Sequence, residues 1–153
     1  MAEKLFIPVF DPGTYFIGML KAYGVFVDRF GNLRRQFHVN VEGRLTDQGF
    51  QLDEAFFYDD GETEMRQWNV TKLGAGRYTG ICADVVGHAS GDLKGNMLSW
   101  RYKFRLPLYG RKVTVTFDDI MVLHEAGVLM NRAVVSKWGI KLGEVLISFR
   151  REV

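Results

Sequence analysis

Residues 98–106 read LSWRYKFRL, and this stretch predicts the fold class of the whole chain. Large apolar residues occupy its even positions, whereas serine, arginine and lysine occupy its odd positions. Successive side chains of a β-strand point to opposite faces of the sheet, so this pattern is typical of a strand with one dry and one wet face. We therefore expect it to form part of the wall around a hydrophobic interior.

The same alternation recurs on both sides of this stretch. Dry positions two residues apart are Phe37, Val39 and Val41, then Val113, Val115 and Phe117, and finally Val145, Ile147 and Phe149. Turn-forming pairs such as Gly31-Asn32 and Gly95-Asn96 separate the segments. The pattern predicts an all-β fold: a single antiparallel up-and-down β-barrel of about 9–10 strands, which leaves no open sheet edge.

One short helical turn is expected near the start of the chain. Asp11 is a suitable N-cap and Pro12 suits the first helical position, so residues 12–20 are predicted to contain it. No linker or compositional break interrupts residues 1–153. We expect one barrel domain, with residues 1–15 as an N-terminal segment that packs on the barrel.

Composition excludes several classes of protein. The net charge is only +2 and no dense basic stripe occurs, so a nucleic-acid partner is not expected. Apolar runs are far shorter than the roughly 18 residues needed to span a bilayer. The single cysteine, Cys82, rules out an internal disulfide. A monomer and a homodimer remain equally open, as does peripheral association with a membrane.

The first ten residues, MAEKLFIPVF, do not resemble a secretory signal peptide, because they carry an acid and a proline. The chain as given is therefore expected to be cytoplasmic. If a leader preceded it, a periplasmic or membrane-anchored location is expected instead.

Several longer motifs resemble those of a known family. They are residues 23–31 (YGVFVDRFG), 52–62 (LDEAFFYDDGE), 100–102 (WRY), 117–121 (FDDIM) and 131–139 (NRAVVSKWG). Together they resemble DUF3833, a bacterial family of unknown function, many members of which look like lipoproteins. The resemblance implies a lipocalin- or calycin-like barrel and supplies no reaction. The chain lacks a lipobox cysteine near its start, which departs from the lipoprotein pattern.

Three charged residues fall on dry faces and are the candidate site. Glu54 is in register with Leu52 and Phe56, Asp119 with Phe117 and Met121, and Arg132 with Met130 and Val134. A buried charge is costly unless it is paired. Either Arg132 forms a structural ion pair with Glu54 or Asp119, or it stays free to bind a ligand carboxylate through its planar fork.

The leading interpretation is a barrel that binds a hydrophobic small molecule, such as a fatty acid or another fatty acyl lipid. Arg132 would lie nearest the polar head, beside Glu54 and Asp119, and the cavity would be lined by Trp100, Tyr102, Phe117, Met121 and Met130. One alternative is an enzyme acting on an apolar substrate, with Glu54 or Asp119 as general acid or base. A second alternative is a structural barrel with a filled core.

No metal site or cofactor is predicted. The cluster at residues 59–62 (DDGE) is typical of a hairpin turn and lacks the full spacing of a calcium loop. His38, His88 and His124 show no metal-ligand spacing.

Overall fold

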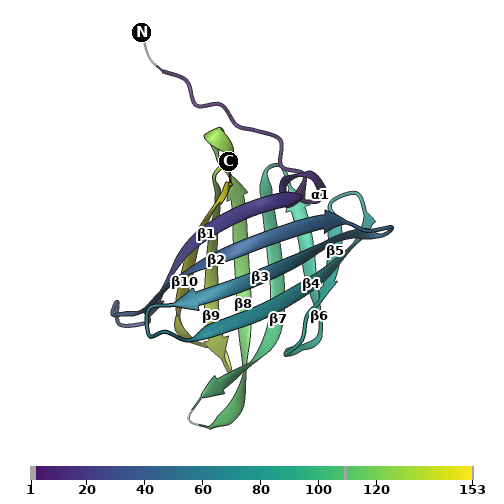
Figure 1. Cartoon of the computed structure of the whole chain (residues 1–153). Coiled ribbons are helices and arrows are strands. Elements are labelled where there is room, and N and C mark those ends of the chain that lie inside the picture. The colour runs from purple at the N-terminus through teal and green to yellow at the C-terminus, as the bar shows by residue number, and fades with distance from the viewer. Residues whose placement is uncertain (1–2, 109, 153) are drawn as a thin grey trace.

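The alternating segments form ten antiparallel strands that close into a barrel in the computed structural model, which describes residues 3–108 and 110–152 (Figure 1). The strands are β1 (Gly18–Asp28), β2 (Leu33–Leu45), β3 (Gly49–Tyr58), β4 (Thr63–Gly74), β5 (Arg77–Ile81), β6 (Val85–Lys94), β7 (Met97–Leu108), β8 (Arg111–Leu123), β9 (Leu129–Lys137) and β10 (Ile140–Arg151). Each strand pairs with its neighbours along the chain, and β1 pairs with β10 to close the sheet. The predicted up-and-down barrel is thereby confirmed.

The N-terminal helix α1 (Pro12–Tyr15) begins where the sequence predicts and ends earlier. Asp11 caps it, because its Oδ1 accepts a hydrogen bond of 3.2 Å from the backbone N–H of Gly13. The predicted region of 12–20 is too long. Gly18 has a φ of +97°, a left-handed conformation that favours glycine, and it already starts β1.

Helix α1 and the residue after it close one end of the barrel. The ring of Phe16 stacks on Phe50 at 5.8 Å and meets Phe149 edge-on at 6.0 Å. The hydroxyl of Tyr15 donates a 2.7 Å hydrogen bond to the carbonyl of Gly127, in the 3₁₀ turn between β8 and β9. Phe10 is buried in the same end, whereas the segment from residue 3 to residue 9 extends away from the barrel (Figure 1).

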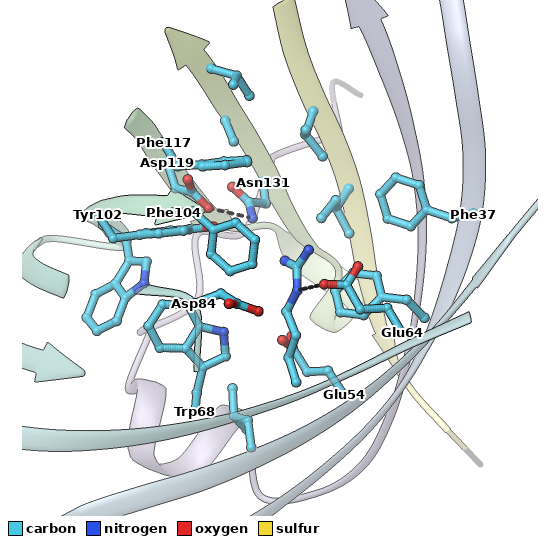
Figure 2. Close-up of a pocket in the computed structure, with 18 of the residues that line it drawn as sticks. Phe37, Glu54, Glu64, Trp68, Asp84, Tyr102, Phe104, Phe117, Asp119 and Asn131 are labelled. Carbon is cyan, nitrogen blue, oxygen red and sulfur yellow. Dashed lines mark hydrogen bonds and ion pairs between the residues drawn. The ribbon is translucent and has the colours of Figure 1, made fainter. Parts of the chain in front are cut away.

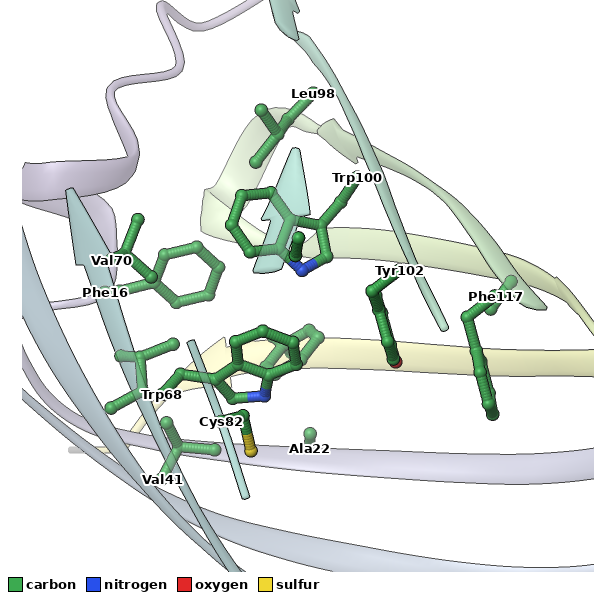
Figure 3. Packing of buried hydrophobic residues seen from close by; sticks show 14 of the residues in the cluster. Phe16, Ala22, Val41, Trp68, Val70, Cys82, Leu98, Trp100, Tyr102 and Phe117 are labelled. Atoms are coloured by element: carbon green, nitrogen blue, oxygen red, sulfur yellow. The ribbon is translucent and has the colours of Figure 1, made fainter. Parts of the chain in front are cut away.

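The half of the interior nearest α1 is packed with aromatic rings. Trp68 of β4 meets Trp100 and Tyr102 of β7 edge-on, with ring centroids 5.6 and 5.2 Å apart, and Tyr102 stacks on Phe117 at 5.0 Å (Figure 3). Strands β4 and β7 are not neighbours in the sheet, so the contacts of Trp68 cross the interior, whereas Tyr102 and Phe117 lie side by side on the neighbouring strands β7 and β8.

Two glycines make room for the largest of these rings. A Cβ atom added to Gly80 or to Gly91 would lie 2.7 or 2.5 Å from the indole of Trp100. These positions on β5 and β6 therefore need glycine for close approach of a side chain, a common use of glycine within strands.

Candidate functional site

The barrel encloses a cavity of about 840 Å³ that reaches the end opposite α1. At that end its rim includes Arg34, Glu62, Asp84 and Lys112, which lie in or beside four of the turns that join the strands there. The volume of this cavity is large compared with the roughly 30 Å³ that one water molecule occupies in the liquid. It lies within the range of small-molecule sites, so the interior is not filled by side chains alone.

The side chains that line the cavity are more deeply buried near α1 than near the rim, and the half near the rim is called the open half below. Interior side chains near α1, such as Phe50, Trp68 and Trp100, are almost fully buried by one another. Nearer the rim the inward-facing side chains are only partly buried, although they contact the core: Phe26, Phe37, Tyr58, Leu106, Leu142, Val145 and Ile147. The aromatic half therefore acts as a floor, and the space above it has largely apolar walls.

A charged group lies in the wall on β4. The Nε of Arg66 donates to Oε1 of Glu64 at 2.8 Å, and the hydroxyl of Tyr58 donates to Oε2 of the same carboxylate at 2.9 Å. The guanidinium carbon of Arg66 lies 4.5 Å from the ring centres of both Phe56 and Phe104, a favourable position for a cation. Figure 2 shows this ion pair as a dashed line at Glu64.

Arg66 is a permanent cation in this setting. Burial opposes its charge, but the hydrogen bond and the charge of Glu64 raise its pKa above the ordinary value for arginine. Only 15% of its side chain is exposed. Within the described chain, the terminal nitrogens Nη1 and Nη2 make no hydrogen bond, so they are available to a group in the cavity.

Glu54 of β3 faces the cavity, as its sequence position predicts, and pairs with Arg66 on the neighbouring strand β4. Burial raises the pKa of its carboxyl to about 7, the charge of Arg66 lowers it in part, and that of Glu64 raises it further. Glu54 is thus a carboxyl group that can gain or lose a proton near neutral pH.

Asp119 of β8 lies in the opposite wall, next to Asn131 of β9 (Figure 2). Each is only 7% exposed. The amide Nδ2 of Asn131 donates to Oδ2 of Asp119 at 3.3 Å, which lowers the pKa of Asp119, but burial outweighs it and raises that pKa to about 7. Asp119 Oδ1 and Asn131 Oδ1 are buried and have no hydrogen-bond partner among the described residues.

The prediction that Arg132 faces the cavity is wrong. Its side chain is 53% exposed and forms an ion pair with Glu144 of β10 on the outer face, where Lys141 also contacts Glu144 at 2.8 Å. Met130 is likewise exposed and does not line the cavity. Both contribute to a shallow outer depression instead.

The pairing of β9 with β8 explains this error. Residues directly opposite each other on antiparallel strands share a face. Leu129 pairs with the buried Leu123, so Asn131 and Ala133 follow it inward and the residues between them point outward. Apolar residues occur on both faces of β9, and alternation alone therefore does not reveal which face is internal.

Arg66 and Glu64 are the site residues that the sequence interpretation missed. They precede Trp68 and Val70 by steps of two, and all four positions point inward on β4. This alternation was available in the sequence. Charged residues at the start of a segment are usually assigned to the wet face, which hides such a pair.

Four of the predicted apolar lining residues contribute to the cavity wall: Trp100, Tyr102, Phe117 and Met121. Their role in binding a ligand stays a prediction.

Burial raises the pKa of the Cys82 thiol to about 11, so this cysteine is protonated at neutral pH and is a poor nucleophile. Among residues 3–108 and 110–152, no group of three or more His, Cys, Asp or Glu side chains is placed to hold a metal ion.

The family follows from a match that spans nearly the whole chain. The model of the family described as "Protein of unknown function (DUF3833)" matches residues 3–151. The chain belongs to DUF3833. No curated protein matches this DUF3833 barrel in sequence. In the described part of the chain, no helix has the length and hydrophobicity required to cross a membrane.

Among solved structures, this DUF3833 barrel resembles an S-type phycobiliprotein lyase from Guillardia theta. The TM-score is 0.68, and the match covers 92% of this chain and 90% of the lyase. Only 7% of the aligned residues are identical, so the likeness concerns the fold. It supports the closed β-barrel that the sequence predicts.

Proposed function

We propose that this barrel binds a hydrophobic small molecule in the open half of its cavity and that Arg66 binds a polar oxygen of that molecule. A fatty acyl chain is the simplest occupant. The observation that carries the proposal is an internal cavity of about 840 Å³ with one buried arginine whose terminal nitrogens have no hydrogen bond within the described residues.

The walls support an apolar body for the ligand. Ligand sites are typically lined by hydrophobic and aromatic side chains with a few placed polar groups. The open half has this composition, with Phe26, Phe37 and Ile147 among its partly buried wall residues. Covering these residues with an apolar chain would remove their exposed surface from water, which is favourable.

The pairing of Arg66 with Glu64 supports its role as a fixed anchor. Nε is held by Glu64, and the guanidinium lies between the rings of Phe56 and Phe104. The remaining N–H donors are therefore oriented before a ligand arrives, which reduces the entropy lost on binding. A carboxylate or carbonyl oxygen is the matching partner.

The test is a binding titration of octadecanoic acid by displacement of a fluorescent fatty acid. We expect Arg66→Met to weaken binding at least about tenfold, since an ionic hydrogen bond contributes about 1.5–3 kcal/mol. Arg132→Met is the matched control and should bind like the wild type, because Arg132 lies outside the barrel. The proposal would be contradicted if the wild type did not bind octadecanoic acid, or if Arg66→Met and Arg132→Met bound it with equal affinity.

A second candidate function is an enzyme that uses Glu54 or Asp119 as general acid or base. The observation favouring it is that burial raises the pKa of both carboxyls to about 7 inside the same cavity. Such values suit proton transfer near neutral pH. Mass spectrometry of the ligand recovered after incubation tests this: a product formed by the wild type and absent with Glu54→Gln or Asp119→Asn, while binding persists, would establish catalysis.

A further inference from the structure

The pair formed by Asp119 and Asn131 has unused hydrogen-bonding capacity. A single hydrogen bond joins the two side chains, and one oxygen on each is buried without a partner in the described residues. Burying a polar atom without a partner is unfavourable, because the hydrogen bonds it made to water are lost. Both side chains line the cavity, so a donor on a bound molecule can satisfy these oxygens once the side chains turn toward it.

The position of this pair relative to Arg66 is defined by the closed sheet. Around the barrel, the adjacent strands β8 and β9 lie five positions from β3 and β4 respectively, which is half of the ten-strand ring. Asp119 and Asn131 therefore line the wall across from Glu54 and Arg66. A ligand in the cavity meets an arginine on one wall and acceptor oxygens on the other.

The chemistry of the two walls differs. Arg66 offers only donors and binds an oxygen of the ligand. Asp119 Oδ1 and Asn131 Oδ1 are oxygen atoms whose buried lone pairs face no N–H or O–H of the protein described here. The ionised carboxylate of a simple fatty acid cannot serve Asn131 Oδ1, because it only accepts hydrogen bonds, and it is repelled by Asp119 whenever Asp119 is ionised.

We infer that the Asp119–Asn131 pair binds a hydroxyl or N–H group on the body of the ligand, so that the preferred ligands are apolar molecules that carry such a donor in addition to the oxygen bound by Arg66. This inference rests on the proposed function and deepens it. Hydroxylated fatty acids and apolar amides belong to this class, whereas unsubstituted fatty acids do not. Sites that pair a buried polar group with a ligand hydroxyl discriminate strongly against the analogue that lacks it.

The test compares octadecanoic acid with its 2-, 10- and 12-hydroxy derivatives by the same displacement titration. We expect the wild type to bind at least one hydroxylated acid about tenfold more tightly than octadecanoic acid. The double variant Asp119→Leu/Asn131→Leu should lose this preference and still bind octadecanoic acid. Asp118→Asn is the control, because Asp118 faces outward beside Arg101 and should leave the preference unchanged.

The outcomes separate the two proposals. If the wild type binds all four acids equally, the inference is wrong and the proposed function stands. If it binds none of them, the proposed function fails and the inference falls with it. Should the double variant not fold, Asn131→Leu alone is measured, and an unchanged preference in that variant would count against a role for the pair.

Discussion

At the scale of single residues, the site contains a few ionisable groups in an apolar interior, and burial changes the pH at which they release a proton. Burial raises the pKa of Asp119 from an ordinary 3.8 to about 7. The folded protein therefore holds a proton on Asp119 at pH values where the unfolded chain has released it. The contribution of Asp119 to stability therefore falls as the pH rises from about 4 to about 7, because the folded state holds more protons on this group across that window.

Asp119→Asn should remove this pH dependence. We expect the stability difference between the variant and the wild type to shift in favour of the variant by about 2–4 kcal/mol from pH 5 to pH 8, since each pKa unit corresponds to about 1.4 kcal/mol. Glu54 titrates in both proteins, so its effect cancels from the difference. Urea unfolding at the two pH values measures this shift. An equal stability difference at pH 5 and pH 8 would show that Asp119 ionises normally in the folded barrel.

Replacing Arg66 and replacing Arg132 should affect stability to different extents. Removing Arg66 leaves Glu64 in the cavity wall without its cation and takes away the contacts with Phe56 and Phe104, so we expect Arg66→Met to cost about 2–3 kcal/mol. The estimate stays at the lower end because a third of the Glu64 side chain is exposed. Arg132→Met should cost less than about 1 kcal/mol, as for other surface ion pairs. Denaturant unfolding of both variants gives the comparison, and equal costs would argue against a buried role for Arg66.

At the scale of strands, the position of a large ring depends on glycines in the strands beside it. Gly91→Ala would bring a Cβ to 2.5 Å from the Trp100 ring, and we expect this overpacking to destabilise the barrel by about 1–3 kcal/mol. Gly74→Ala is the control, since nothing lies within 4 Å of a Cβ there. Thermal unfolding and near-ultraviolet circular dichroism of the tryptophans report both effects. A Gly91→Ala variant with wild-type stability and spectrum would contradict the packing described.

Strand alternation could be read from the sequence with uneven success. The inner face of β7 is predicted correctly, because large apolar residues from Leu98 to Leu106 occur on one face only. The inner face of β8 is also predicted correctly, because Val113, Val115 and Phe117 alternate with polar residues in its first half. β9 was placed with its faces exchanged, since Met130 and Val134 on one face compete with Leu129, Ala133 and Val135 on the other. The pairing of β9 with β8 determines which face of β9 is internal, and this pairing cannot be read from the alternation of one strand.

At the scale of the whole molecule, the barrel combines a packed floor with an open outer half. Val145 of β10 lies in the open half, between Phe26 of β1 and Ala133 of β9 in the strand register. We expect Val145→Phe to reduce ligand affinity because the larger ring occupies the cavity. Its thermal stability should not fall, because there is empty space to receive the ring.

Leu146→Phe is the matched control for this variant. Leu146 follows Val145 on the same strand and is exposed on the outer face, so binding of octadecanoic acid should not change. Both variants are assayed by thermal unfolding and by the displacement titration. If Val145→Phe binds as tightly as the wild type, the ligand does not occupy the open half of the cavity.

The order of polar and apolar residues along the chain determined the all-β class, the approximate number of strands, the N-terminal cap at Asp11 and the inward position of Glu54 and Asp119. These features are local, since each depends on side chains a few residues apart on one strand or turn. The outward position of Arg132, and which polar groups face each other in the cavity, were decided only by strand pairing and closure of the barrel. Closure brings β3 and β4 opposite β8 and β9, and it makes the face of each strand depend on the register of its neighbours.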